Sequence, residues 1–193
     1  KNNEFLITSE SNSKNICEFR GLTKVFGSTR ALSNVSFEIP KGTVHGVVGE
    51  NGAGKSTLIN IIGGSILCDE GVMIIDGKTL SPKTPLEARN AGISVVHQEF
   101  PQCEHMTVGE NLFLSPKPLG GRGLLSKSKL AQHAQDALNR AQIELNASDK
   151  VESLTVGQKQ LVEIARAVSL GAKLVIMDEP TSALTELEAG LLF

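Results

Sequence analysis

Nine consecutive residues, Gly49 to Thr57, have the types and spacing that can hold the phosphate tail of a nucleotide. They read G-E-N-G-A-G-K-S-T and fit the pattern G-x-x-x-x-G-K-[ST]. Glycines let the backbone come close to an anion, and the start of the following helix is positive. We expect Lys55 to reach the β- and γ-phosphates and Ser56 to ligate Mg²⁺. A glycine-rich turn capped by Ser56 is the alternative. The predicted phosphate-binding residues are Gly49, Glu50, Asn51, Gly52, Ala53, Gly54, Lys55, Ser56 and Thr57.

Two adjacent carboxylates, Asp178 and Glu179, follow an apolar run that reads L-V-I-M. A carboxylate at the carboxyl end of a buried strand can hold the Mg²⁺ shell, which is the role expected of Asp178. Glu179 can orient and polarise a water in line with the γ-phosphate. The alternative is an acidic turn that leads into Pro180.

Gln98 ends another run typical of a strand, Gly92 to Gln98. Its side-chain amide both donates and accepts hydrogen bonds, so it can contact both Mg²⁺ and the attacking water. A glutamine that caps a helix or lies in a loop explains the residue equally well. The neighbouring His97 is interpreted as structural.

A second segment with anion-binding chemistry is Leu154 to Gln158, which reads L-T-V-G-Q. Thr155 supplies a hydroxyl, Gly157 an unobstructed backbone N–H, and the helix that follows a positive dipole. One nucleotide site does not need two phosphate cradles. We therefore infer that two such domains dock head to tail, each completing the nucleotide site of the other.

The periodicity of the chain predicts the elements that position these residues. The phosphate loop lies between a short strand and a helix, and apolar spacing at Leu161, Ile164, Ala165 and Val168 predicts a strong helix that ends before Gly171. Residues 100–153 contain several Pro and Gly and are interpreted as a mostly helical insert. Strands are expected at 16–20, 35–39, 43–48, 72–77, 92–98 and 173–179, and helices at 55–62, 127–142 and 158–170.

Composition limits the class of protein. The 193 residues suffice for one sizeable domain, or one with a small insert, and the net charge of −2 with interspersed charges does not favour nucleic acid as a partner. No apolar run reaches membrane-spanning length, and no signal-peptide pattern is present. Cys17, Cys68 and Cys103 are far apart, fit a reducing cytosol, and are interpreted as small buried apolar residues.

In their order along the chain, these segments resemble the nucleotide-binding domain of ABC transporters, from Ile16 onward. The phosphate loop is similar to that family's Walker A motif, and Leu174–Glu179 is similar to Walker B with its catalytic glutamate. Gln98 falls at the place of the Q-loop glutamine, and Leu154–Gln158 at the place of the signature, commonly L-S-G-G-Q.

The resemblance implies roles for two further segments and also shows departures from the pattern. Phe26 occupies the position of the aromatic residue that stacks on adenine, commonly a Tyr, and Ser182–Thr185 resembles the D-loop. In the signature, Thr155 replaces the usual Ser and keeps its hydroxyl. Val156 replaces the usual Gly, which restricts the backbone and is expected to weaken this half of the site.

The implied fold class is α/β, a P-loop NTPase core with a mostly parallel sheet, an antiparallel β subdomain and a helical insert, truncated at the C-terminus. The expected organisation is a flexible leader over 1–14 and an ABC-type nucleotide-binding domain over 15–193. In it, 15–98 and 158–193 form the core with the β subdomain, and 99–157 the helical subdomain. The family's switch histidine lies on a later strand, so the end of the domain is expected to be missing.

The residues around Gln98, Gln158 and Glu179 resemble bacterial sugar importers of the ribose/galactose/xylose type, most closely the first of their two fused ATPase domains. This implies an ATPase that uses ATP and Mg²⁺, with Glu179 and Gln98 catalytic, and Ser56, Gln98 and Asp178 at the metal. The implied nucleotide-binding residues are those of the phosphate loop with Phe26, Thr155, Gly157 and Gln158.

The implied partners are a second nucleotide-binding domain, transmembrane permease subunits and, indirectly, a solute-binding protein, with no nucleic acid. The implied location is cytoplasmic, peripheral on the inner face of the cell membrane. The alternatives are an ABC ATPase outside transport, such as one of DNA repair or translation, and a nucleotide-binding module with little hydrolysis. A P-loop kinase is disfavoured by the long separation of Lys55 from Asp178 and by the second cradle.

Overall fold

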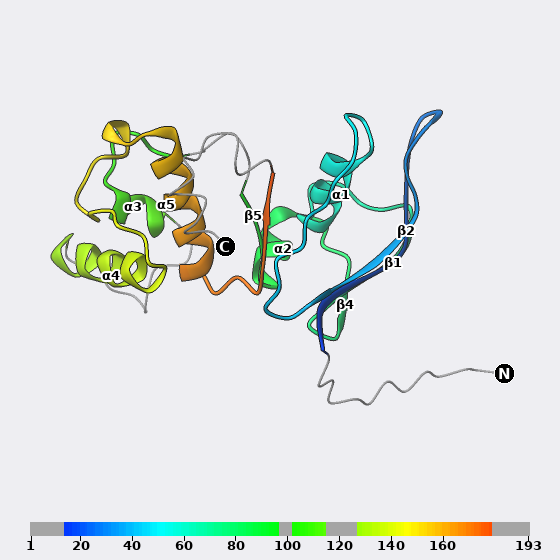
Figure 1. The fold of residues 1–193 in the computed structure, drawn as a ribbon, viewed down its shortest axis with the longest axis horizontal. Coiled ribbons are helices and arrows are strands. Elements are labelled where there is room, and N and C mark those ends of the chain that lie inside the picture. The colour runs from blue at the N-terminus through cyan, green and yellow to red at the C-terminus, as the bar shows by residue number, and fades with distance from the viewer. Residues whose placement is uncertain (1–13, 97–101, 115–126, 179–193) are drawn as a thin grey trace. The chain divides into compact units, whose positions relative to one another are not determined.

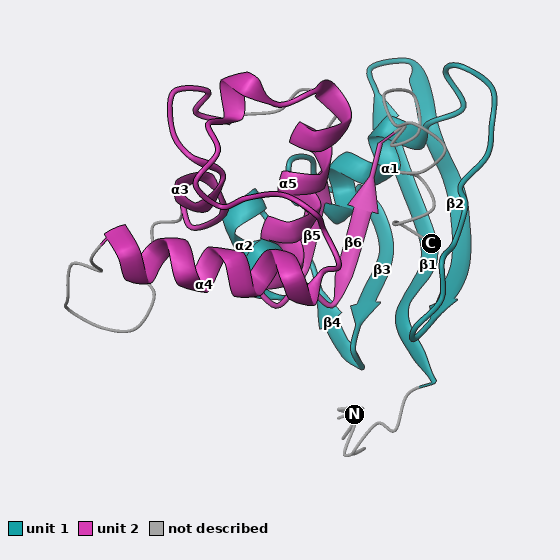
Figure 2. Ribbon diagram, turned by 60° about the vertical axis from the view of Figure 1, so that its left-hand side comes forward, with its two compact units in different colours: residues 1–91 teal, residues 92–193 magenta. Residues whose placement is uncertain are grey.

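The computed structural model describes residues 14–96, 102–114 and 127–178. The chain forms two compact units, Lys1–Ala91 and Gly92–Phe193 (Figure 2). The predictions for the leader, for Gln98, for Glu179 and for the D-loop segment fall on residues outside those described.

Unit 1 is built on a four-stranded antiparallel sheet in the order β2-β1-β3-β4. The strands β1 (Asn15–Phe26) and β2 (Thr29–Pro40) form a long hairpin (Figure 1). The strands β3 (Glu70–Ile75) and β4 (Lys78–Leu80) are joined by the two residues Asp76 and Gly77. Both have positive φ, 48° and 76°, the conformation that favours an Asp-Gly hairpin turn.

Two helices complete unit 1, α1 (Lys55–Ile62) and α2 (Pro85–Asn90). The core of the unit consists of apolar side chains from the sheet and α1, because alternate strand residues and one stripe of the helix turn inward. The fully or nearly fully buried members include Cys17, Phe19, Leu22, Leu58, Ile61, Ile62, Met73 and Ile75.

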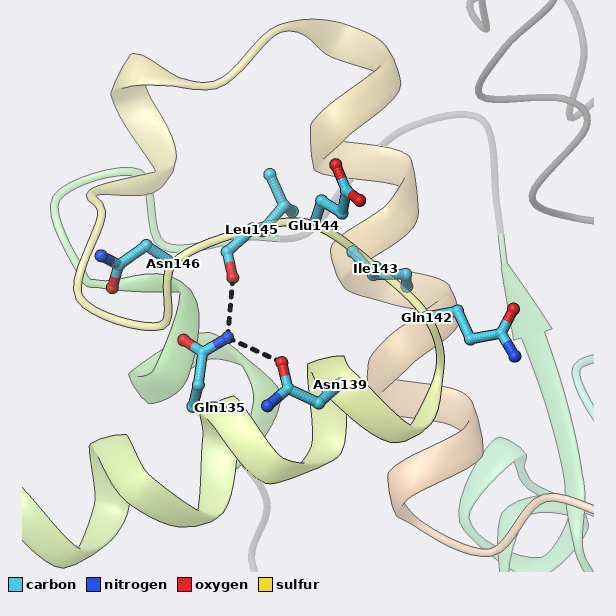
Figure 3. Close-up of a pocket in the computed structure, with 7 residues that line it drawn as sticks. All are labelled: Gln135, Asn139, Gln142, Ile143, Glu144, Leu145 and Asn146. Carbon is cyan, nitrogen blue, oxygen red and sulfur yellow. Dashed lines mark hydrogen bonds between the residues drawn. The ribbon is translucent and has the colours of Figure 1, made fainter.

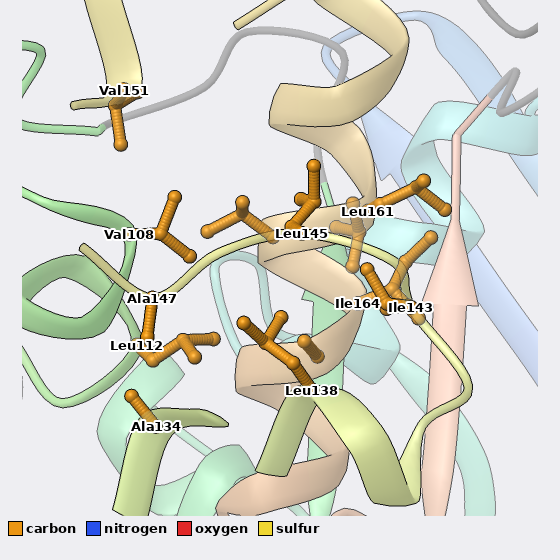
Figure 4. Close-up of a cluster of buried hydrophobic side chains, with 13 residues drawn as sticks. Val108, Leu112, Ala134, Leu138, Ile143, Leu145, Ala147, Val151, Leu161 and Ile164 are labelled. Atoms are coloured by element: carbon orange, nitrogen blue, oxygen red, sulfur yellow. The ribbon is translucent and has the colours of Figure 1, made fainter. Parts of the chain in front are cut away.

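Unit 2 contains a parallel pair of strands, β5 (Ile93–Val96) and β6 (Leu174–Met177), in register from Ile93 beside Leu174 to Val96 beside Met177. Its helices are α3 (Val108–Leu112), α4 (Lys127–Arg140), the 3₁₀ turn η1 (Val151–Ser153) and α5 (Val156–Ser169). Figure 4 shows the apolar cluster that joins them, in which Val108, Leu112, Leu138, Val151 and Val162 are inaccessible to solvent.

These elements confirm the predicted fold class, with an antiparallel β portion, parallel strands and a helical insert. The strong predicted helix is α5, and it begins two residues earlier than expected because Thr155 and Gln158 form a capping box. Past its end, Gly171 has φ of 76° and Ala172 N–H bonds to Ala167 C=O, which closes the helix with a Schellman motif.

Three expectations were wrong. No strand forms over residues 43–48, where Val48 is 95% exposed. A strand needs a hydrogen-bonded neighbour, and a run of β-type residues alone does not supply one. Val168 is 51% exposed and lies away from the buried stripe of α5. Cys103 is exposed and Cys68 half-buried, whereas Cys17 is buried as predicted.

No helix among the described residues combines the length and the apolar character needed to cross a bilayer.

Candidate functional site

The predicted phosphate loop is a turn that leads directly into α1. Ala53 N–H bonds to Glu50 C=O at 3.1 Å, which closes the turn, and the helix begins at Lys55. Gly54 precedes the helix with φ of 94°, in the left-handed region that glycine adopts without strain. A Cβ at Gly54 would lie 2.4 Å from the carbonyl oxygen of Ala31, so the loop passes against β2 where only glycine fits.

The start of α1 has unpaired backbone donors. The first bond of the helix joins Leu58 N–H to Gly54 C=O at 2.9 Å, so the N–H groups of Lys55, Ser56 and Thr57 have no acceptor inside the helix. No side chain among the described residues caps this end. The three helices α2, α3 and α5, by contrast, are each capped by a threonine hydroxyl.

The ammonium of Lys55 lies over the same loop. Its Nζ donates to the carbonyl oxygens of Gly49 at 2.6 Å and of Glu50 at 3.0 Å. The positive end of α1, its free N–H groups and this ammonium therefore converge on one exposed loop. That donor set fits a polyphosphate, because every group is a donor or a cation and the loop is open to solvent.

The second predicted anion-binding segment lies at the start of α5. Thr155 Oγ1 accepts from Gln158 N–H at 3.2 Å, and Gln158 Oε1 accepts from Thr155 N–H at 3.0 Å. This leaves the N–H groups of Val156 and Gly157 without helical acceptors, next to the Thr155 hydroxyl hydrogen. Val156 is 56% exposed, so its side chain stands at the helix start in contact with solvent. The segment can thus offer several donors to an anion.

The aromatic residue of the prediction, Phe26, is the last residue of β1 and is 46% exposed. Lys24 Nζ lies 5.3 Å from the centroid of its ring. Asp69 binds the same lysine, with Oδ1 at 2.8 Å from Nζ. Sequence reasoning missed Lys24 and Asp69, because 45 residues separate them and no local pattern links them.

The predicted metal and catalytic residues are only partly described. Ser56 is exposed in the first turn of α1, and Asp178 directly follows β6, where its N–H bonds to Val96 C=O at 3.2 Å. Gln98 and Glu179 lie outside the described residues. The roles of all four remain predictions.

Unit 2 also has an open pocket of about 530 Å³ between α4 and the loop that follows it, lined by Gln135, Asn139, Gln142, Ile143, Glu144, Leu145 and Asn146. Gln135 donates to Asn139 Oδ1 and to Leu145 C=O, both at 3.1 Å (Figure 3), and accepts from Ala147 N–H at 2.9 Å. Its amide is therefore used in holding the loop, and none of the lining residues is a predicted site residue.

Comparison with known proteins gives consistent results. The protein family described as ABC transporter matches residues 32–182. A ribose import ATP-binding protein of Rhizobium meliloti (strain 1021) is 41% identical over 181 residues, which are 94% of this chain and 35% of that protein. The chain thus spans about a third of the length of the curated relatives it matches.

Two solved structures share the fold. An ATP-binding cassette of an ABC transporter in its ADP conformation superposes with a TM-score of 0.78 at 31% identity, over 93% of this chain and 74% of that one. A dimeric ATP-binding cassette in a post-hydrolysis state, bound to ADP and Pi, gives a TM-score of 0.72 at 30% identity, over 91% and 79% of the two chains.

Proposed function

Because the chain belongs to the ABC transporter family, we propose that it is the ATP-binding and ATP-hydrolysing part of an ABC importer for a sugar. The observation that carries this proposal is the start of α1, where uncapped N–H groups and the Lys55 ammonium face one exposed loop. The sugar is inferred from relatives such as the ribose import protein.

Within this proposal ATP and Mg²⁺ are bound by the residues predicted from the sequence. The backbone of Gly49–Thr57 and the Lys55 ammonium hold the phosphates, and Phe26 receives the adenine ring. Ser56, Asp178 and Gln98 hold Mg²⁺, which supplies charge neutralisation at the phosphates when bound. Glu179 takes the role of the group that orients a water.

In this proposal the start of α5 forms the second half of a nucleotide site, whose first half is the phosphate loop of another nucleotide-binding domain. Its donors are of the same kind as those of the phosphate loop, the Thr155 hydroxyl and the N–H groups of Val156 and Gly157 at a positive helix end. The partner is a second copy or a second domain of the same chain. The dimeric relative bound to ADP and Pi agrees with this arrangement.

In the proposed importer, closure of two such domains on ATP drives transmembrane permease subunits, and a solute-binding protein delivers the sugar to them. The chain then acts on the cytoplasmic side, peripheral to the inner face of the membrane. We also propose the domain division inferred from the sequence, with 99–157 as the helical subdomain.

The binding site is tested by titration calorimetry, which compares the affinity for ATP with Mg²⁺ of the Lys55→Ala variant and of the unaltered chain. Charge-assisted hydrogen bonds are worth about 1.5–3 kcal/mol, so the loss of this ammonium should weaken ATP by at least about 10- to 100-fold. Lys41→Ala is the matched control, because Lys41 pairs with Asp76 at 2.9 Å outside the loop and its loss should leave ATP affinity unchanged. Equal affinity of Lys55→Ala and the unaltered chain would exclude the proposed site.

A further inference from the structure

The ring of Phe26 is exposed but not isolated. It projects from the end of β1, beside the turn at Gly27 and Ser28, and the ammonium of Lys24 lies 5.3 Å from the ring centroid. Residues two apart on a strand lie on the same face of a sheet, which is how Lys24 reaches the ring. With one face of the ring held by a cation, a planar ligand can stack on the other.

The cation is itself held in place. Lys24 Nζ pairs with Asp69 Oδ1 at 2.8 Å, and the Lys24 side chain is only 13% exposed. The other oxygen of Asp69 accepts from Val25 N–H at 2.7 Å, and Asp69 N–H donates to Thr23 C=O at 2.9 Å. The hydrogen bond from Lys24 is the main cause that holds the pKa of Asp69 below its usual value, so this carboxylate is charged at neutral pH.

The position of Asp69 follows from the end of a strand ladder. The pairing of β1 with β3 reaches Thr23 beside Glu70 and stops there, so β3 offers no backbone acceptor to Val25. The Asp69 carboxylate supplies that acceptor and fixes the end of β1, which pairs with a bulged part of β2 whose register shifts on both sides of Lys24. Asp69 thereby fixes both the backbone at Val25 and the position of the Lys24 ammonium, next to Phe26.

We propose that Lys24 and Asp69 are positioning residues for the nucleotide base, which stacks on the face of Phe26 opposite the Lys24 ammonium. This inference rests on the proposed function, in which Phe26 receives the base. An ammonium draws π-electron density toward its own side of the ring, which makes the opposite face a better partner for the electron-rich face of a purine. It also holds the ring in one orientation before the base arrives, which reduces the entropy lost on binding.

The test separates base binding from phosphate binding. Affinities for ATP and for inorganic tripolyphosphate, both with Mg²⁺, are measured by calorimetry for each variant. Cation–π contacts and the stacking that they support predict that Lys24→Met weakens ATP by about 3- to 10-fold, and tripolyphosphate by less than about 2-fold. Lys24→Arg keeps a cation over the ring and should restore ATP affinity. Asp69→Asn should change the ATP to tripolyphosphate ratio in the same direction as Lys24→Met.

Arg20→Met is the matched control, because Arg20 is a cation of the same strand in an ion pair with Glu18 at 2.6 Å. It should leave both affinities unchanged. Equal weakening of ATP and tripolyphosphate binding in Lys24→Met would show a merely structural role. An unchanged ATP affinity in that variant would likewise overturn the proposal. Failure of the proposed function looks different, since the unaltered chain would then bind neither ligand, or Lys55→Ala would bind both as well as the unaltered chain does.

Discussion

Replacing Gly54 by alanine should destabilise the fold more than the same change two residues earlier. The backbone of Gly54 has φ of 94°, which costs an L-residue about 1–2 kcal/mol. Its added Cβ would also lie 2.4 Å from Ala31 O and 2.9 Å from Leu32 Cδ2. Relief of such a contact requires β2 or the loop to shift, and overpacking of this kind costs about 1–3 kcal/mol. The expected loss in free energy of unfolding is therefore about 2–5 kcal/mol.

Gly52→Ala separates the two causes. Gly52 has a similar φ of 83°, but a Cβ there meets no atom within 4 Å, so only the cost of the backbone conformation of about 1–2 kcal/mol remains. Urea unfolding followed by far-ultraviolet circular dichroism suits a chain without Trp or Tyr. A Gly54→Ala variant no less stable than Gly52→Ala would refute the close approach of the loop to β2.

Three further predictions concern unit 2 and the cysteines. Thr155→Ala removes the hydroxyl that accepts from Gln158 N–H, so urea unfolding should show a loss of about 0.5–2 kcal/mol in the free energy of unfolding. Thr155→Ser should retain the cap, and equal losses in the two variants would argue against the capping box. In thiol titration of the folded chain, Cys103 should react quickly and Cys17 only after denaturant is added, because Cys17 is buried. Burial raises the pKa of Cys17 from 9.0 to about 11, so between these pH values the unfolded chain releases a proton that the folded chain keeps. The free energy of unfolding should therefore fall by about 2 kcal/mol as pH rises from 9 to 11. A Cys17→Ala variant with the same pH-dependent fall would contradict that assignment.

The features predicted well from the sequence are local ones. The spacing of Leu161, Ile164 and Ala165 indicates an amphipathic helix, and these three residues lie on the buried face of α5. The conformation of the phosphate loop likewise depends on adjacent residues, since Gly54 directly precedes α1 and Lys55 is the first residue of the helix. Such features depend on a few adjacent dihedral angles and hydrogen bonds.

The features missed depend on partners far along the chain. The β-type run at 43–48 indicated a strand, but such a run does not say which neighbour would pair with it, and these residues form no strand in the structure. Asp69 lies 45 residues from Lys24, and only the end of the β1–β3 ladder shows why they meet.

The central claim is that one nucleotide is held by the phosphate loop of one domain and the α5 start of another. Two variants test this claim, and each is defective in one of the two halves of the nucleotide site. Lys55→Ala lacks the cation of the loop, and Val156→Asp places a carboxylate at the first position of α5. An acidic residue there favours the helix but repels an incoming phosphate.

Sedimentation with Mg²⁺ and a non-hydrolysable ATP analogue then gives the decisive comparison. Each variant alone should remain monomeric, because every site formed between two identical copies has one defective half. An equal mixture should form a dimer with one nucleotide bound, since one of its two sites combines an intact loop with an intact α5 start. A mixture that stays monomeric while the unaltered chain dimerises would contradict the head-to-tail arrangement.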